Sequence, residues 1–84
     1  MPYIVEDERE KYDRVIDQLD QIETKGQLEY VIFKLMVLYM KRKKMNYSNL
    51  HDCIYAAKHC GDEFRRRFLD VREDQARNQN GDVK

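Results

Sequence analysis

The sequence has one proline and three glycines in 84 residues, and it has no tryptophan. Charged residues make up 38% of the chain, a composition that suits exposed helix faces and disfavours a fold rich in sheet. No glycine-rich phosphate loop, HExxH motif or Ser-His-Asp arrangement occurs. We therefore expect a helical protein that is not an enzyme and needs no cofactor.

The chain also has little cysteine, and its two thiols do not fit a disulfide or a metal site. Cys53 and Cys60 lie seven residues apart, which is roughly 10.5 Å along a helix and too far for a bridge. With His51 and His59 they match no zinc spacing, since C-x₂-C and H-x₃₋₅-H are both missing. Both cysteines fall on a predicted core stripe, so we expect buried, inert thiols in a reducing cytoplasm.

Long hydrophobic runs are missing as well. The longest apolar stretch, residues 31–40, contains Lys34 and falls short of the ~20 residues that a membrane span needs. Acidic residues crowd positions 6–10, where a secretory signal would carry positive charge. We expect a soluble cytoplasmic protein with no membrane partner.

The formal net charge is zero, but the charges are segregated along the chain. Residues 1–29 carry −5, residues 30–67 carry +6 and residues 68–84 carry −1. The acidic segment either neutralises the basic body in the fold or leaves a basic face free for an anionic partner. Zero net charge, with no helix-turn-helix signature, makes DNA an unexpected partner.

Periodicity predicts two helices in the first half of the chain. The first starts near Asp7 and carries an apolar stripe that extends to Ile22, and Gly26 lies in the break that follows. Thr24 and Gln27 have the spacing of a capping box for the second helix. That helix ends at the basic run 41–44 and is apolar nearly all round, with a main stripe formed by Leu28, Val31, Ile32, Leu35, Leu38 and Tyr39.

A third helix follows, with Ser48 or Asn46 as its cap, and extends to about Ala76. It would span ~40 Å against ~27 Å for the second helix, so its later apolar residues would lack a partner within the chain. A chain this short also has a thin core, burying only about 60% of its unfolded surface. The prediction is an all-α three-helix hairpin or bundle with a long third helix, assembled as a dimer or larger oligomer. Residues 1–77 form one helical domain and residues 78–84 a flexible polar tail.

The basic residues offer a candidate anion site. Tyr30, Lys34, Lys41 and Lys44 share one edge of the second helix, and a tyrosine ring beside cations can stack a base and hold phosphates. The alternative is that the basic run 41–44 only complements the helix dipole and that the arginine run 65–67 is a solvated helix face. Glu63 lies four residues before Arg67, where it can pair with it and neutralise it.

Three stretches together resemble a family of small uncharacterised helical proteins of bacteria, archaea and phages. They are the opening MPYI, the segment 28–35 (LEYVIFKL), and the ending in which EF at 63–64 and RR at 66–67 precede ED at 73–74 and NGDV at 80–83. The resemblance implies a helical fold but no established activity. The chain departs from the family pattern at Arg65 and Arg72, where tyrosines are usual, and at Val71, where a proline is usual. Losing that helix breaker would let the third helix run on. The matching polar positions are the candidate ligand-binding residues, namely Tyr30, Lys34, Glu63, Arg66 and Arg67.

Two functions remain open at this stage. The first is an oligomeric binding protein that captures an anionic small ligand such as a nucleotide signal, by analogy with the sponge proteins by which phages counter host defence. The second is a protein–protein inhibitor or adaptor that acts through apolar and tyrosine-rich helix faces. For either function, the resemblance implies a prokaryotic or phage origin of the protein.

Overall fold

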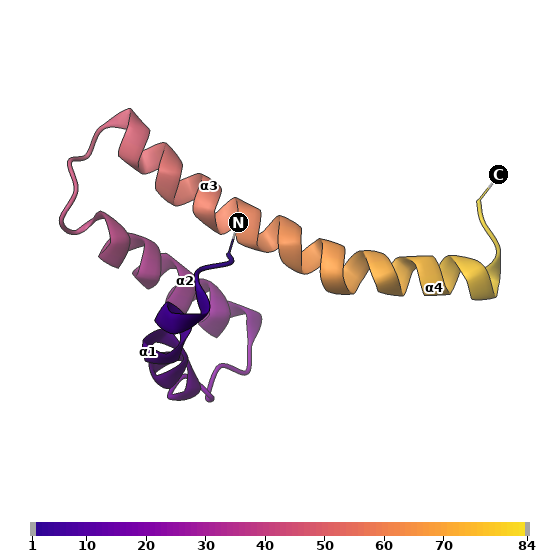
Figure 1. The fold of residues 1–84 in the computed structure, drawn as a ribbon. Coiled ribbons are helices and arrows are strands. Elements are labelled where there is room, and N and C mark those ends of the chain that lie inside the picture. The colour runs from indigo at the N-terminus through magenta and orange to yellow at the C-terminus, as the bar shows by residue number, and fades with distance from the viewer. Residues whose placement is uncertain (1, 84) are drawn as a thin grey trace.

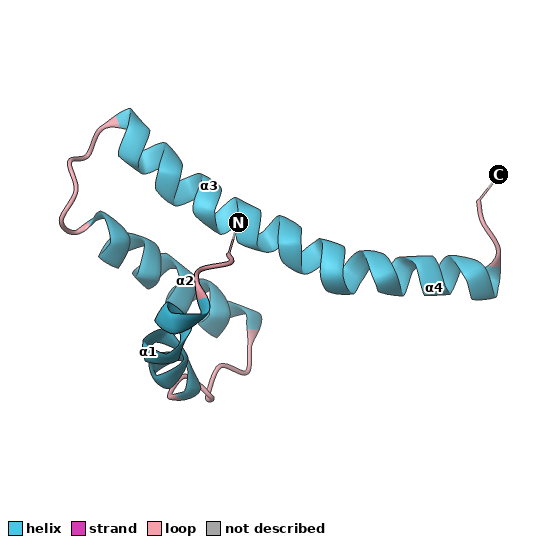
Figure 2. Ribbon diagram, viewed as in Figure 1, coloured by secondary structure: helices cyan, strands magenta, loops and turns pink. Residues whose placement is uncertain are grey.

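The computed structural model describes residues 2–83, and all regular structure in that range is helical (Figures 1 and 2). Helix α1 spans Glu6–Asp17 and α2 spans Lys25–Met40. A third helix runs without a break through α3 (Tyr47–Phe64), a π-helical segment η1 (Arg65–Leu69) and α4 (Asp70–Asn80). The all-α prediction with a long third helix is therefore confirmed.

The start of α2 follows from local hydrogen bonding. The Thr24 hydroxyl accepts the backbone N–H of Gln27 at 3.1 Å, and the Gln27 side chain accepts the backbone N–H of Thr24 at 3.1 Å. This reciprocal pair is the predicted capping box, and it satisfies two backbone donors that the helix itself cannot pair. The predicted break at Gly26 is wrong, because the cap places Gly26 inside the first turn of α2.

The other helix ends differ in part from the prediction. Asn46 caps α3 by accepting the backbone N–H of Asn49 at 2.9 Å, so it is the cap rather than Ser48. Helix α1 begins at Glu6 and ends at Asp17, although the apolar stripe continues to Ile22. The apolar spacing therefore overestimated the length of α1.

The third helix is longer than predicted. It comprises 34 residues, or about 51 Å at 1.5 Å per residue, and it passes the predicted end near Ala76 to reach Asn80. Gly81 ends it with a φ of 85°, a conformation that a residue without Cβ adopts freely. Because no proline interrupts residues 65–80, the chain stays helical there, with a π segment where the helix bends (Figure 1).

Helices α2 and α3 form an antiparallel hairpin that packs mainly near its loop. Met40 and Cys53 are the buried apolar residues, with 5% and 6% of their surface exposed, and the Cys53 thiol lies 3.6 Å from the Met36 carbonyl oxygen. The rest of the predicted stripes stays at least partly exposed, and Cys60 is exposed rather than buried as expected. The chain by itself thus lacks the core that its apolar residues would supply.

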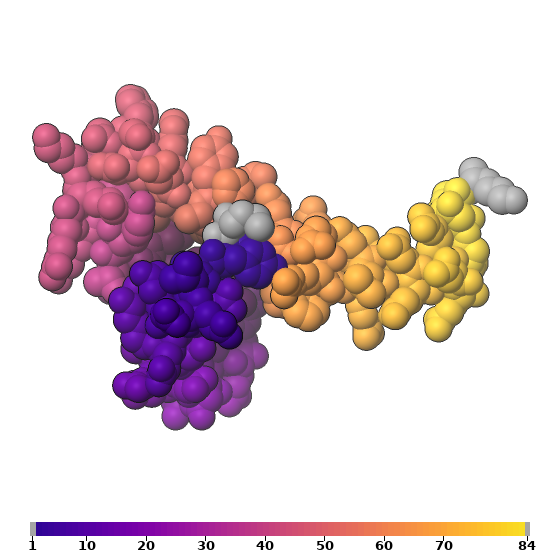
Figure 3. All heavy atoms as spheres, viewed as in Figure 1, coloured from indigo at the N-terminus to yellow at the C-terminus, as the bar shows by residue number. Residues whose placement is uncertain are grey.

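The molecule is extended, as Figure 3 makes visible in the arm formed by η1 and α4. Its radius of gyration is 16.7 Å and its longest dimension is 51 Å. A compact domain of this length would have a radius of gyration of about 12 Å. The arm projects beyond the α2–α3 hairpin and leaves the side chains of Phe68, Leu69 and Val71 half exposed.

Candidate functional site

An open apolar groove lies between α2 and α3, and we call it the interhelical groove. The two helices run antiparallel side by side (Figure 1), and the side chains buried between them, Met40 and Cys53, lie toward the connecting loop. The space between them has a volume of about 620 Å³. It is lined by Leu28, Ile32, Leu35, Met36, Tyr39, Cys53, Ala56, Ala57, Cys60, Gly61 and Phe64.

The two walls of the groove differ in side-chain size. The α2 wall presents large aliphatic side chains, whereas the α3 wall has small residues at Ala56, Ala57 and Gly61. A Cβ atom added at Gly61 would meet nothing within 4 Å, so the α3 wall is open at that point. Apart from the two thiols, the Tyr39 hydroxyl is the one side-chain donor among the lining residues, and the groove therefore suits an apolar occupant.

A second feature is a cluster of two arginines around one carboxylate at the end of α3. Arg66 donates to Glu63 Oε1 from both Nε, at 3.0 Å, and Nη2, and Arg67 donates from Nε at 3.2 Å. Only 14% of the Glu63 side chain is exposed, against 67% and 53% for the two arginines. Glu63 is therefore the shielded centre of the cluster, and its charge is matched within the chain.

Hydrogen bonding lowers the pKa of the Glu63 carboxyl below its ordinary value of 4.5. The hydrogen bonds from Arg66 are the largest cause, desolvation opposes them, and a hydrogen bond from the Tyr3 side chain and the charge of Arg66 lower the pKa further. The same contact raises the pKa of Arg66. Glu63 thus stays ionised and occupies donors that a phosphate would otherwise use.

Tyr3 belongs to this cluster, although the sequence analysis did not assign it there. The Arg67 guanidinium carbon lies 5.0 Å from the centre of the Tyr3 ring, within cation–π range. The extended lead before α1 therefore crosses to the end of α3. Apolar spacing gives no signal for a contact between residues sixty positions apart, and the tyrosine at position 3 of the MPYI motif was the only hint.

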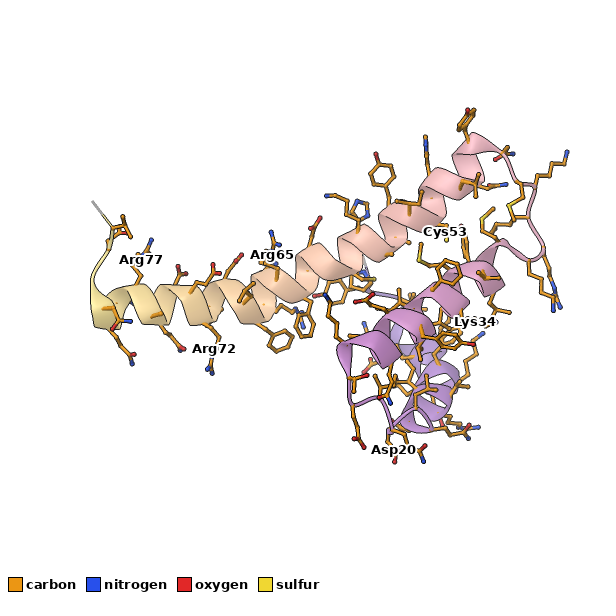
Figure 4. All side chains as sticks on the ribbon, turned by 180° about the vertical axis from the view of Figure 1, so that it is seen from behind. Asp20, Lys34, Cys53, Arg65, Arg72 and Arg77 are labelled. Carbon is orange, nitrogen blue, oxygen red and sulfur yellow. The ribbon has the colours of Figure 1, made fainter. Side chains whose placement is uncertain are left out.

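The structure does not bring Tyr30 and Lys34 to this cluster within one chain. The Lys34 amine lies 6.0 Å from the Tyr30 ring centre, so these two predicted site residues do meet each other. At 100° per residue they lie roughly 150–180° around α2 from the groove-lining residues, and α3 packs on the other side. Figure 4 shows Lys34 on α2 and Arg65 on the long helix, on separate parts of the molecule. A meeting of Lys34 with Arg66 or Arg67 across a subunit interface stays a prediction.

Among the described residues, 2–83, no ion pair joins the acidic first segment to the basic body. Within residues 2–83, each salt bridge joins residues three or four apart on the same helix. None of them involves Lys34 or the basic run 41–44, although Lys43 lies 4.7 Å from the Tyr39 ring centre. Lys34 and the run 41–44 therefore form no salt bridge within residues 2–83, whereas Arg66 and Arg67 are paired with Glu63.

The outer face of α3 carries an aromatic ladder that the sequence analysis missed. Tyr47, His51, Tyr55 and His59 follow one another at four-residue spacing, with ring centres 6.0, 6.2 and 6.1 Å apart. This face lies roughly opposite the interhelical groove around the helix. The sequence already indicates that Tyr47 and Tyr55 lie off the core stripe, and the i, i+4 spacing with His51 and His59 is the signal for the ladder.

In the range 2–83, no group of three or more His, Cys, Asp or Glu side chains is placed to hold a metal ion. No described helix combines the length and the apolar character needed to cross a membrane.

Comparison with known proteins gives one result. The model of a family described as Domain of unknown function (DUF6899) matches residues 1–83. No curated protein and no solved structure matches the chain. The match agrees with the resemblance to an uncharacterised helical family, and its description assigns no activity.

Proposed function

The chain belongs to this family of unknown function, and we propose that it is a non-enzymatic protein-binding module whose interhelical groove accepts the apolar face of a helix. The observation that carries the proposal is the open groove of about 620 Å³, which is lined almost wholly by apolar side chains. Grooves of this chemistry are a recurring site for amphipathic helices.

The exposed area of the chain supports an occupied groove. The accessible surface is 8287 Å² for a mass of 10.3 kDa. A compact monomer of that mass exposes roughly 5,400 Å², so about 2,900 Å² is in excess. Obligate interfaces bury about 2,000–5,000 Å². These areas count both partners, so one chain loses about 1,000–2,500 Å², and an interface of that class would remove a large part of the excess.

The thiol of Cys60 is a direct probe of the groove. Cys60 lines the groove and is exposed in the isolated chain, whereas Cys53 is buried. We expect Cys60 in the reduced protein to react with a chromogenic disulfide reagent at least about tenfold more slowly than in the denatured chain, because an occupant covers it. One thiol that reacts at the fully exposed rate in the folded protein would contradict the proposal.

Two matched variants test whether the slow reaction of Cys60 is caused by an occupant of the groove. Ile32 lines the groove and is 40% exposed, whereas Val37 is 50% exposed and lies on the far side of α2. Ile32→Glu places a charge where an apolar face would dock, and should make Cys60 reactive. Val37→Glu should leave the protection unchanged. Circular dichroism checks that both variants remain helical.

Capture of an anionic small ligand such as a nucleotide is a second candidate, supported by one observation. Lys34 is stacked beside Tyr30 but forms no salt bridge within residues 2–83, so its charge is available. A ring and a free cation can together hold a base and a phosphate. The test is thermal shift against a panel of cyclic and linear nucleotides, and stabilisation by none of them would exclude this candidate.

A further inference from the structure

Resting on the proposed groove function, we propose that the helix that fills the groove is α3 of a second copy of this chain. The two α3 helices would run antiparallel about a two-fold axis that passes between Ala57 and Cys60. The result is a four-helix assembly of two α2–α3 hairpins. Four features of the chain point to a second copy rather than to an unrelated helix.

The groove wall on α3 is self-complementary about that axis. Small residues occupy its centre at Ala57 and Cys60, while Phe64 lies at one end and remains 65% exposed. In an antiparallel pair, Phe64 of each copy comes level with Cys53 of the other, which also lines the groove. Each copy then gives and receives the same contact, as a two-fold interface requires.

The charges fit the same register. Counted from the axis at 1.5 Å per residue, Asp70 of one copy comes level with Tyr47 of the other. Tyr47 is the first residue of α3, so the first turn of α4 then lies beside the end of the loop that carries the run 41–44. The first turn of α4 is acidic and the run 41–44 is wholly basic. Within residues 2–83, neither Asp70, Glu73 nor a cation of the run 41–44 forms a salt bridge. In this register, acids and cations that form no salt bridge in one chain come near one another between two chains.

The projecting arm also acquires a role in this arrangement. Helix α4 contacts only the segment that precedes it, and it extends away from α2 (Figure 1). In the antiparallel pair, the arm of each copy lies along the loop end of the other hairpin. The half-exposed side chains of Phe68 and Leu69 then face a neighbour.

Gly61 is the fourth feature. It lies inside α3, where glycine is a poorer helix former than alanine, and nothing in its own chain fills the space at its Cβ position. A close approach by another helix at that point would account for the missing side chain.

Cys60 lies close to the proposed axis and reports on it directly. Its Cβ should lie about 10 Å or less from that of the second copy, given the usual interaxial distance of packed helices. A short bis-maleimide should therefore yield a species of twice the 10.3 kDa chain mass, but only slowly, because the paired helices cover Cys60. Cys60→Ser should abolish the product. Because Cys53 is buried in the isolated chain, Cys53→Ser should retain the product.

A charge exchange tests the register. Glu73→Lys and Lys44→Glu should each weaken dimerisation roughly fivefold at low salt, and the double exchange should restore it. Asp82→Lys, beyond the end of α4, serves as the control and should have no effect. If each single variant dimerises like wild type, the antiparallel register is wrong.

Light scattering separates this inference from the function on which it rests. A mass of twice 10.3 kDa with the cross-link supports both. A protected Cys60 in a single chain bound to another protein would retain the groove function and overturn the second copy. A mass of one chain at micromolar concentration with a fully reactive Cys60 would overturn both.

Discussion

Replacing Gly61 with alanine should have opposite effects on the single chain and on the assembly. Glycine in a helix interior costs about 1 kcal/mol relative to alanine. In the isolated chain the added Cβ meets no atom within 4 Å, so Gly61→Ala should raise the free energy of unfolding of a lone chain by about 1 kcal/mol. That gain corresponds to roughly 4–8 °C in melting temperature for a domain of this size.

The assembly should respond the other way. If a second helix packs closely at Gly61, each added methyl group overpacks the interface, at a cost of about 1–3 kcal/mol per site. Two sites per dimer give a loss of about 2–6 kcal/mol, or a dissociation constant at least roughly 30-fold higher. Because the helix is formed in both the free and the paired chain, its improved propensity does not offset this loss.

Sedimentation equilibrium measures the dissociation constant, and thermal unfolding over a range of protein concentrations measures both effects. Gly26→Ala is the matched control, since Gly26 is also helical but lies outside the groove, 4.0 Å from the Thr24 hydroxyl at its Cβ position. It should leave the dissociation constant unchanged. If Gly61→Ala also leaves that constant unchanged, no helix approaches Gly61 and the proposed packing is refuted.

Three further predictions concern single interactions. Because the pKa of Glu63 is lowered in the folded chain, its contribution to stability is present above its ordinary value of 4.5 and is lost as pH falls through the lowered value. Urea unfolding should therefore show a smaller loss of stability on acidification for Glu63→Gln than for wild type, and equal losses would contradict this. Thr24→Ala removes the side-chain half of the capping box and should cost about 1 kcal/mol in urea unfolding, whereas an unchanged value would mean that the cap does not stabilise α2. Lys34→Ala should weaken the binding of any phosphate-bearing ligand and reduce the salt dependence of that binding. An affinity that is unchanged in the variant and independent of salt would show that Lys34 is not part of the site.

Local features of the sequence determined the helices and several of their ends. Several signals act within one helical turn, namely the capping box at Thr24 and Gln27, the basic run after Met40 and the side chain of Asn46. Their effect can therefore be predicted from the sequence without knowledge of the tertiary structure. The missing proline at position 71 likewise allowed the third helix to continue. Such short-range interactions depend only on which residues stand a few positions apart in the sequence.

The tertiary structure decided which apolar stripes are covered. The spacing of residues on α2 and α3 marks apolar faces but does not say how closely the two helices pack, and here Cys60 and Gly61 line an open groove. It also decided that Tyr3 joins Glu63 and Arg67 while Lys34 lies on the far side of α2. Such pairings depend on the angle between the helices and on the path of the chain. Both result from all tertiary contacts together, and no single segment of the sequence encodes them.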